Sequence, residues 1–210
     1  MQFTDRTRRF QLTFSLLLSF ALFSGCTTLS SRLSSSPNKG SYSIMQGPTG
    51  SSWTRINVLR DKSEKLDVVC SQEDTGTLEA KLIQNTTREF AASQAVIEEY
   101  AVQGLDPEKT YQMKVYRGGK LVDERSFSAL AKKEKLNFAV ISCADDQYLT
   151  EQKKMWGFLA RENPDFILSI GDHPYADRYQ GKPVVNAEPF MLWDRYVDAR
   201  KNLDLYRFAR

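Results

Sequence analysis

The sequence predicts a β-sandwich followed by an incomplete α/β domain, and a change of pattern along the chain supports this division. Residues 41–130 contain short segments in which apolar and polar residues alternate, separated by turn signals such as Gly118-Gly119. After Leu130 a charged linker leads into two continuous apolar segments that flank a helical pattern, which is typical of a βαβ unit. With 210 residues, the chain can form one large domain or two small ones.

About seven short strands are expected in the first part, a number and spacing typical of a β-sandwich. Ile56 and Val58 in one segment, and Met113 and Val115 in another, repeat with the period of two that places them on one face of a sheet. The predicted strands are residues 41–46, 53–60, 65–71, 77–84, 95–102, 110–117 and 121–130.

The segment GLDPEKTYQMKVY resembles the tyrosine corner of fibronectin type III domains. Leu105, Pro107, Tyr111 and Val115 have its spacing, in which the tyrosine hydroxyl bonds to the backbone a few residues upstream. The resemblance implies a type III-like sandwich over residues 41–130 that acts as a spacer or cover. The alternative is an unrelated hairpin with a core tyrosine.

Composition narrows the functional classes. A hydrophobic content of 41% and a charged content of 26% are typical of a globular protein. The net charge of +3 is small, so we expect no nucleic-acid-binding surface, which would need dense Lys and Arg. Cys70 lies in a strand-like segment where a buried thiol is the usual case, and we do not expect it to pair with Cys143. The oligomeric state is not predicted.

The first 25 residues are predicted to be an export signal. A basic segment precedes the apolar core Leu12–Phe23, which is too short to span a bilayer as a helix. Ser24-Gly25-Cys26 resembles a bacterial lipobox, which implies cleavage after Gly25, lipidation of Cys26 and a lipid-anchored protein in the cell envelope, at the outer membrane or the periplasmic face. Residues 26–40 are predicted to form a flexible tether. A plain Sec signal is the alternative, and the twin arginines leave Tat export open.

The second part predicts a strand, a helix and a second strand over about 35 residues. Residues 136–142 and 165–170 read as buried parallel strands, and the helix between them is expected to begin after a cap at Thr150 and to end at Asn163-Pro164. Residues 189–210 predict a further amphipathic helix with a solvated basic face. Its apolar face is expected to contain Leu192, Tyr196 and Ala199.

Chemically active residues follow both predicted parallel strands. One strand ends in Ser142-Cys143 and the other in Gly171-Asp172, with Tyr175 shortly after. Adjacent parallel strands present their carboxyl ends at the same edge of a sheet, where ligands of such sheets bind. A thiolate, a carboxylate and a phenolate together suit a trivalent transition metal, so this edge is predicted to be a metal site.

Residues 137–175 carry a resemblance to PhoD-like alkaline phosphatases, of the calcineurin-like metallophosphatase superfamily. The motifs are a strand ending in Ser-Cys, a helix with a Trp, NPDFILSIGD, and a Tyr three residues after that Asp. The resemblance implies that residues 135–210 are the N-terminal part of a metallophosphatase domain using iron and calcium. It assigns Cys143 and Tyr175 to iron and makes Asp172 the catalytic carboxylate shared between the metals. The implied substrates are phosphate mono- or diesters.

The sequence departs from this family at several points. His173 and Pro174 stand where other residues are common, and no later Asp-Asp-His segment occurs in a chain with one histidine. We therefore expect a truncated chain that is inactive by itself. The alternative is a non-catalytic envelope lipoprotein whose β-sandwich is a binding module.

Each candidate site residue also has a structural interpretation. Cys143 could be a core thiol, Asp172 a turn cap and Tyr175 a packing residue. His173 is expected to lie beside the site and not to bind metal, and the other loop acids are expected to be solvated. Those acids are Asp145, Asp146 and Asp177.

Overall fold

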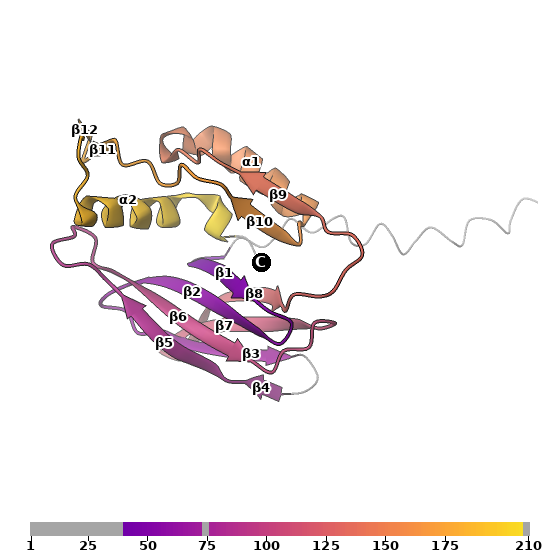
Figure 1. Cartoon of the computed structure of the whole chain (residues 1–210). Helices are drawn as coiled ribbons and strands as arrows, with labels where there is room; N and C mark the ends of the chain where they lie inside the picture. Colours follow the sequence, from indigo (N-terminus) through magenta and orange to yellow (C-terminus); the bar gives the residue numbers. More distant parts are fainter. Residues whose placement is uncertain (1–39, 73–75, 208–210) are drawn as a thin grey trace, which may run out of the picture. The chain divides into compact units, whose positions relative to one another are not determined.

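Within residues 40–72 and 76–130, two antiparallel sheets lie face to face and form a β-sandwich (Figure 1). The structure is a computed structural model that describes residues 40–72 and 76–207, so the predicted signal peptide, Cys26 and nearly all of the predicted tether lie outside the described residues. The first sheet has the order β1-β2-β6-β5, and the second has the order β4-β3-β7-β8. The strands are β1 (Ser43–Thr49), β2 (Trp53–Asp61), β3 (Asp67–Gln72), β4 (Gly76–Leu78), β5 (Ala80–Thr86), β6 (Ala95–Gln103), β7 (Thr110–Arg117) and β8 (Lys120–Ser128).

One predicted strand, residues 77–84, is divided between the two sheets. Leu78 pairs with Cys70 of β3, whereas Ala80 pairs with Val102 of β6. The chain therefore changes sheets at Glu79, which belongs to neither β4 nor β5. Alternation of apolar residues predicts extended backbone but cannot show that an edge strand crosses from one sheet to the other.

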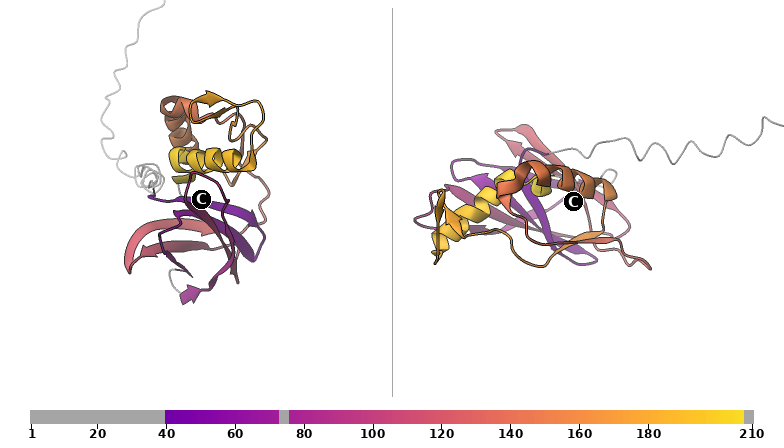
Figure 2. Two further views of the ribbon diagram at one scale, coloured as in Figure 1. Left: turned by 90° about the vertical axis from the view of Figure 1, so that its left-hand side faces the viewer. Right: turned by 90° about the horizontal axis from the view of Figure 1, so that it is seen from above.

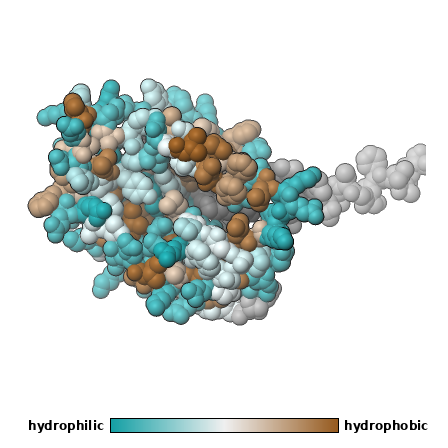
Figure 3. Space-filling model, in the orientation of Figure 1, coloured by the Kyte–Doolittle hydropathy of each residue, from teal (hydrophilic) through white to brown (hydrophobic). Residues whose placement is uncertain are grey.

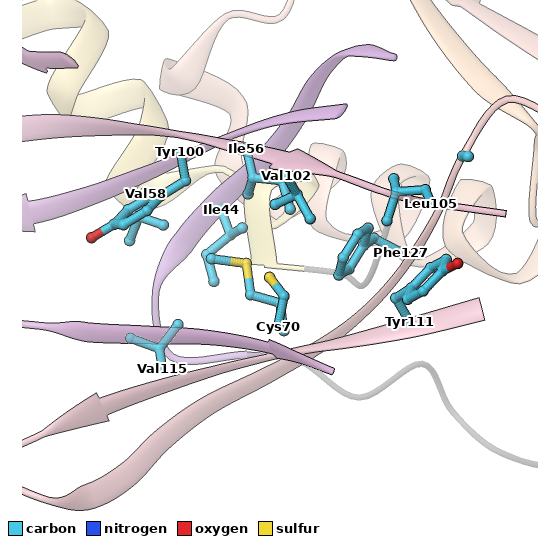
Figure 4. Close-up of a cluster of buried hydrophobic side chains, with 12 residues drawn as sticks. Ile44, Ile56, Val58, Cys70, Tyr100, Val102, Leu105, Tyr111, Val115 and Phe127 are labelled. Carbon is cyan, nitrogen blue, oxygen red and sulfur yellow. The ribbon is translucent and has the colours of Figure 1, made fainter. Parts of the chain in front are cut away.

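The core of the sandwich lies between the sheets and is built from the predicted alternating positions. Figure 4 shows side chains of both sheets pointing toward one another around Cys70, among them Ile56 and Val58 from β2 and Val115 from β7. Cys70 is buried, as predicted. Cys70 and Cys143 are both free thiols and do not pair, also as predicted, and Cys143 is exposed. Burying these branched side chains removes apolar surface from water, which is the main force that holds the sheets together.

The thiol of Cys70 gives the protein a pH-dependent stability. Burial raises its pKa from 9.0 to about 12, because the thiolate would lose its hydration in the core. The unfolded chain releases this proton near pH 9 but the folded chain retains it. The free energy of unfolding therefore falls by about 1.4 kcal/mol per pH unit above pH 9 on account of this group.

Urea unfolding of the wild type and of Cys70→Ala between pH 7 and pH 10.5 measures this effect. The tyrosines titrate alike in both proteins, so the difference in stability isolates Cys70. We expect the advantage of the wild type to be full below pH 9 and to shrink as the pH rises. A difference that stays constant with pH would contradict the argument.

The predicted tyrosine corner is present in its geometry. The hydroxyl of Tyr111 accepts a hydrogen bond of 2.7 Å from the backbone N–H of Asp106, and the side chain of Leu105 is buried in the core. The ring of Tyr111 stacks on Phe127 with their centroids 5.5 Å apart. The predicted hairpin at Gly118-Gly119 is also confirmed, since both glycines have positive φ angles and join β7 directly to β8.

The predicted βαβ unit is confirmed as β9 (Phe138–Ile141), α1 (Leu149–Glu162) and β10 (Phe166–Ser169), with the two strands parallel. Asn163 ends α1 in a left-handed conformation before Pro164, as expected. The predicted cap at Thr150 is wrong. A short 3₁₀ turn, η1 (Asp146–Tyr148), leads directly into α1, and Asp145 caps this turn by accepting a 3.0 Å hydrogen bond from the N–H of Gln147.

The prediction that both parallel strands are buried is wrong. Phe138 of β9 is 52% exposed and Leu168 of β10 is 48% exposed. The outward-facing side chains form an apolar face, which we define as Leu136, Phe138, Val140, Phe166, Leu168 and Ile170. Figure 3 shows hydrophobic side chains gathered over these strands. These strands have the apolar side chains that are typical of a parallel sheet covered on both faces. Among the described residues, however, none covers this face.

Helix α2 (Pro189–Asn202) returns the chain to the sandwich and packs on the outer face of the first sheet (Figures 1 and 2). Trp193 and Val197 contact Leu59 of β2 and Ala95 of β6 in a second apolar cluster. The predicted apolar face was partly wrong, because Leu192 is 44% exposed. The predicted solvation of the basic residues fails at Arg200, which is fully buried.

The chain continues into a 3₁₀ turn, η2 (Asp204–Arg207), which lies between α1 and β1. A small hairpin of β11 (Arg178–Tyr179) and β12 (Lys182–Pro183) precedes α2. A third apolar cluster joins the end of α2 and η2 to α1 and β9, and its buried members are Ala144, Trp156, Ala199, Leu203 and Tyr206. No helix of the described residues is long and apolar enough to cross a membrane.

Candidate metal centre

The two parallel strands bring Cys143 and Asp172 to the same edge of their sheet. Ile141 pairs with Ser169, and the backbone pairing continues beyond the strands. The N–H of Ile170 donates to the carbonyl of Ile141 at 3.0 Å, and the N–H of Cys143 donates to the carbonyl of Gly171 at 3.3 Å. The side chains that follow the strands are therefore held close together by the backbone.

Three donor atoms converge at this edge. The Cys143 Sγ atom lies 3.6 Å from Oδ2 of Asp172, and the Tyr175 hydroxyl lies 3.5 Å from the same oxygen. Cys143 and Asp172 both have positive φ angles, 56° and 54°, which are uncommon for residues other than glycine. Gly171, at φ 129°, occupies a conformation that only glycine adopts readily. The backbone thus turns sharply after each strand to present these side chains.

The phenol of Tyr175 is held in its protonated form. Hydrogen bonding to Cys143, loss of solvent and the nearby charge of Asp172 raise the pKa of Tyr175 to about 12. A cation placed among these three groups would reverse the effect, because its charge favours phenolate and thiolate together. The protonation of this tyrosine therefore depends on whether a cation is bound.

The three side chains fit the donor set of one transition-metal ion. Ligand atoms at about 2.0–2.3 Å from a shared ion lie roughly 3–4 Å from each other, and the two separations above fall within this range. Sulfur and phenol oxygen favour a transition metal such as iron over calcium, which takes about six to eight oxygen ligands. Among the described residues, no three His, Cys, Asp or Glu side chains gather to hold a metal, so the predicted calcium stays a prediction.

The other predicted residues lie around this trio. His173 contacts the carbonyl of Ala144 through Nδ1 at 3.3 Å and the hydroxyl of Tyr206 through Nε2, so it bridges two segments beside the site. Asp145 caps η1, and the side chain of Asp177 is exposed. The alternative that Cys143 is a core thiol is wrong, because this thiol is exposed. The alternative that Tyr175 is a packing residue stays open, because its side chain is partly buried.

Sequence reasoning missed two residues that contact this segment. The Arg195 Nε atom donates to the carbonyl of Tyr175 at 3.0 Å, and Tyr206 contacts His173. Both come from the region of α2 and η2, which lies far along the chain. No local pattern could indicate them, because their contacts depend on how α2 packs against the sandwich.

A separate groove of 660 Å³ lies beside the C-terminal end of α2, lined partly by β1, β2 and the adjoining ends of β7 and β8. Two ion pairs lie within it, Arg117 with Glu64 at 2.8 Å and Lys201 with Asp61 at 2.7 Å. None of the three predicted metal ligands lines it. Basic side chains outnumber acidic ones in its lining, whereas the exposed edge carries Cys143 and Asp172.

Comparison with known proteins leaves the family of the chain open. No protein-family model matches the sequence, and no curated protein matches it.

Proposed function

We propose that this chain carries part of a metal-dependent phosphoesterase site of the PhoD-like type, in which Cys143, Asp172 and Tyr175 bind iron. The observation that supports the proposal is the convergence of a thiol, a carboxylate and a phenol at the ends of two parallel strands, with donor separations of 3.6 and 3.5 Å. Asp172 is central, because one of its oxygens contacts both other groups.

The residues of the chain have distinct roles in this proposal. Asp172 supplies the negative charge that holds a cation, and Cys143 and Tyr175 make the site selective for a transition metal. Bound metal would polarise a phosphate ester and lower the pKa of a coordinated water. Hydrolysis of mono- or diesters also requires donors beyond these three, including those for the predicted calcium.

The proposal also includes the type of each of the two parts of the chain. The tyrosine corner and the sheet order β1-β2-β6-β5 support a fibronectin type III-like sandwich. The parallel β9-α1-β10 unit supports the start of a metallophosphatase domain over residues 135–210. Export to the bacterial envelope with a lipid anchor on Cys26 rests on the sequence of the signal region.

Titration of the purified full chain with Fe(III) tests the metal site. We expect one equivalent to bind and to produce a visible charge-transfer band from the phenolate and thiolate ligands. Tyr175→Phe should lose the phenolate part of the band, whereas Tyr148→Phe, at an exposed tyrosine of η1, should retain it. A folded protein that binds no iron would contradict the proposal and favour the alternative of a non-catalytic lipoprotein.

A further inference from the structure

Helix α2 is firmly anchored on the β-sandwich. The carboxylate of Asp194 accepts hydrogen bonds from the backbone N–H groups of Ala92 and Ser93 at 2.9 and 2.8 Å. Six residues further along the helix, Arg200 donates to the side-chain and backbone oxygens of Ser43 at 2.8 and 3.2 Å. Because both charged side chains are buried and hydrogen-bonded, the helix is fixed at two points along its length.

The anchored helix and η2 in turn hold the segment that carries the candidate ligands. Arg195, next to Asp194, donates to the carbonyl of Tyr175 at 3.0 Å. Tyr206 of η2 contacts Nε2 of His173, and Nδ1 of the same ring contacts the carbonyl of Ala144, adjacent to Cys143. These contacts fit a neutral imidazole in which Nδ1 donates and Nε2 accepts from the tyrosine hydroxyl.

Tyr206 is itself fixed in place. Its ring is buried in the third apolar cluster with Trp156 and Leu203, and the guanidinium carbon of Arg200 lies 5.0 Å from the ring centroid. A side chain held by packing on one side and by a cation on the other has little freedom to move. It can therefore define the position of the imidazole that it contacts.

We propose that α2 and η2 position the Asp172–Tyr175 segment for its metal ion, with Tyr206 and Arg195 as positioning residues. Because α2 is anchored on the β-sandwich, the sandwich supports the metal site. This inference rests on the proposed function for its ligand. It differs from the expectation that the sandwich is only a spacer or cover, because two routes link the sandwich to the ligand segment. One runs from the loop before β6 through Asp194 and its chain neighbour Arg195 to the carbonyl of Tyr175. The other runs from Ser43 of β1 to Arg200, whose guanidinium packs on the ring of Tyr206, which contacts His173.

Metal affinity gives the first test. Partners that hold metal ligands in orientation are worth about 10–100-fold in affinity. Tyr206→Phe in the full chain should therefore weaken Fe(III) binding at least tenfold, and Arg195→Met should act in the same direction. The matched control is Tyr111→Phe, which also removes a buried hydroxyl that makes a hydrogen bond but lies in the sandwich core. Tyr111→Phe should leave iron affinity unchanged, even if it lowers the thermal midpoint of unfolding as much as Tyr206→Phe does.

A second test needs no metal. The Cys143 thiolate attacks a sulfur of an anionic disulfide reagent and releases the other half of the reagent as a thiolate. Asp172, 3.6 Å from this sulfur, should slow the attack because its negative charge repels the approaching reagent. Releasing the segment should speed the reaction severalfold in Tyr206→Phe and in Arg195→Met, and Asp172→Asn should do the same. The rate of Cys143 is obtained by difference from the same protein carrying Cys143→Ser.

The two tests separate the inference from the proposed function. If the wild type binds no iron but both variants speed the reaction of Cys143, the positioning role holds and the phosphoesterase proposal fails. If iron binds and neither variant changes affinity or thiol reactivity, the positioning role is overturned. Should Tyr206→Phe fail to fold, Arg195→Met alone decides, since this side chain is only partly buried.

Discussion

Asp172→Asn is expected to lower the iron affinity of the chain by more than about 100-fold, beyond the loss seen when only the supports of a metal ligand are removed. The substitution preserves the shape of the side chain but replaces an anionic oxygen donor with a neutral amide. The affected oxygen contacts both Cys143 and Tyr175, so the charge that would hold a cation among all three groups is lost. In any preparation that hydrolyses p-nitrophenyl phosphate esters, the same substitution should abolish turnover.

Asp177→Asn provides the matched control for this experiment. Asp177 is an exposed acid on the same loop, and its substitution removes one negative charge without touching the trio. We expect iron affinity within about twofold of the wild type, since salt screens the charge of a solvent-exposed side chain. Equal affinity in Asp172→Asn and the wild type would remove Asp172 from the metal site.

Trp156→Ala is expected to cost about 3–5 kcal/mol in the free energy of unfolding, the range for truncating a large aromatic residue in a core. Trp156 is 2% exposed and packs against Ala199, Leu203 and Tyr206, so it joins α1 to the end of α2. Its indole N–H also donates to Gln152 at 3.1 Å. Small domains have a total stability of about 5–15 kcal/mol, so a loss of this size would be large.

Phe158→Ala on the same helix should change stability by less than about 0.5 kcal/mol, because an exposed side chain leaves no cavity when it is removed. Phe158 is 60% exposed. The two variants therefore compare a buried with an exposed aromatic side chain on the same helix. Urea denaturation followed by far-ultraviolet circular dichroism measures both. Similar losses in the two variants would mean that α1 is not docked through Trp156.

The sandwich could be predicted well because its signals are local. Alternation placed Ile56, Val58, Met113 and Val115 on inward faces, and paired glycines marked a hairpin. The inward face of α2 could not be predicted in the same way. Trp193, Val197 and Arg200 form the stripe that faces the sheet, which only the packing of the helix determines. Of the predicted residues, Leu192 is 44% exposed, whereas Ala199 is buried in the third apolar cluster.

The apolar face of β9 and β10 shows a second limit. A continuous apolar strand predicts that both of its faces prefer to be covered, but it does not supply the cover. At the candidate site, too, one contact could be predicted from the sequence and another could not. Parallel pairing was enough to predict that Cys143 and Asp172 lie together, while the contact of Tyr206 with His173 links residues that share no local pattern.

The return of α2 to the sandwich also affects what proteolysis would do to the molecule. The exposed connection after β8 contains Lys132, Lys133 and Lys135, each a site for trypsin. A single cut there would sever the covalent link but leave the carboxylate clamp of Asp194 and the buried guanidinium of Arg200 in place. The nicked halves would stay associated as complementing fragments, and neither piece alone would retain the fold of the whole.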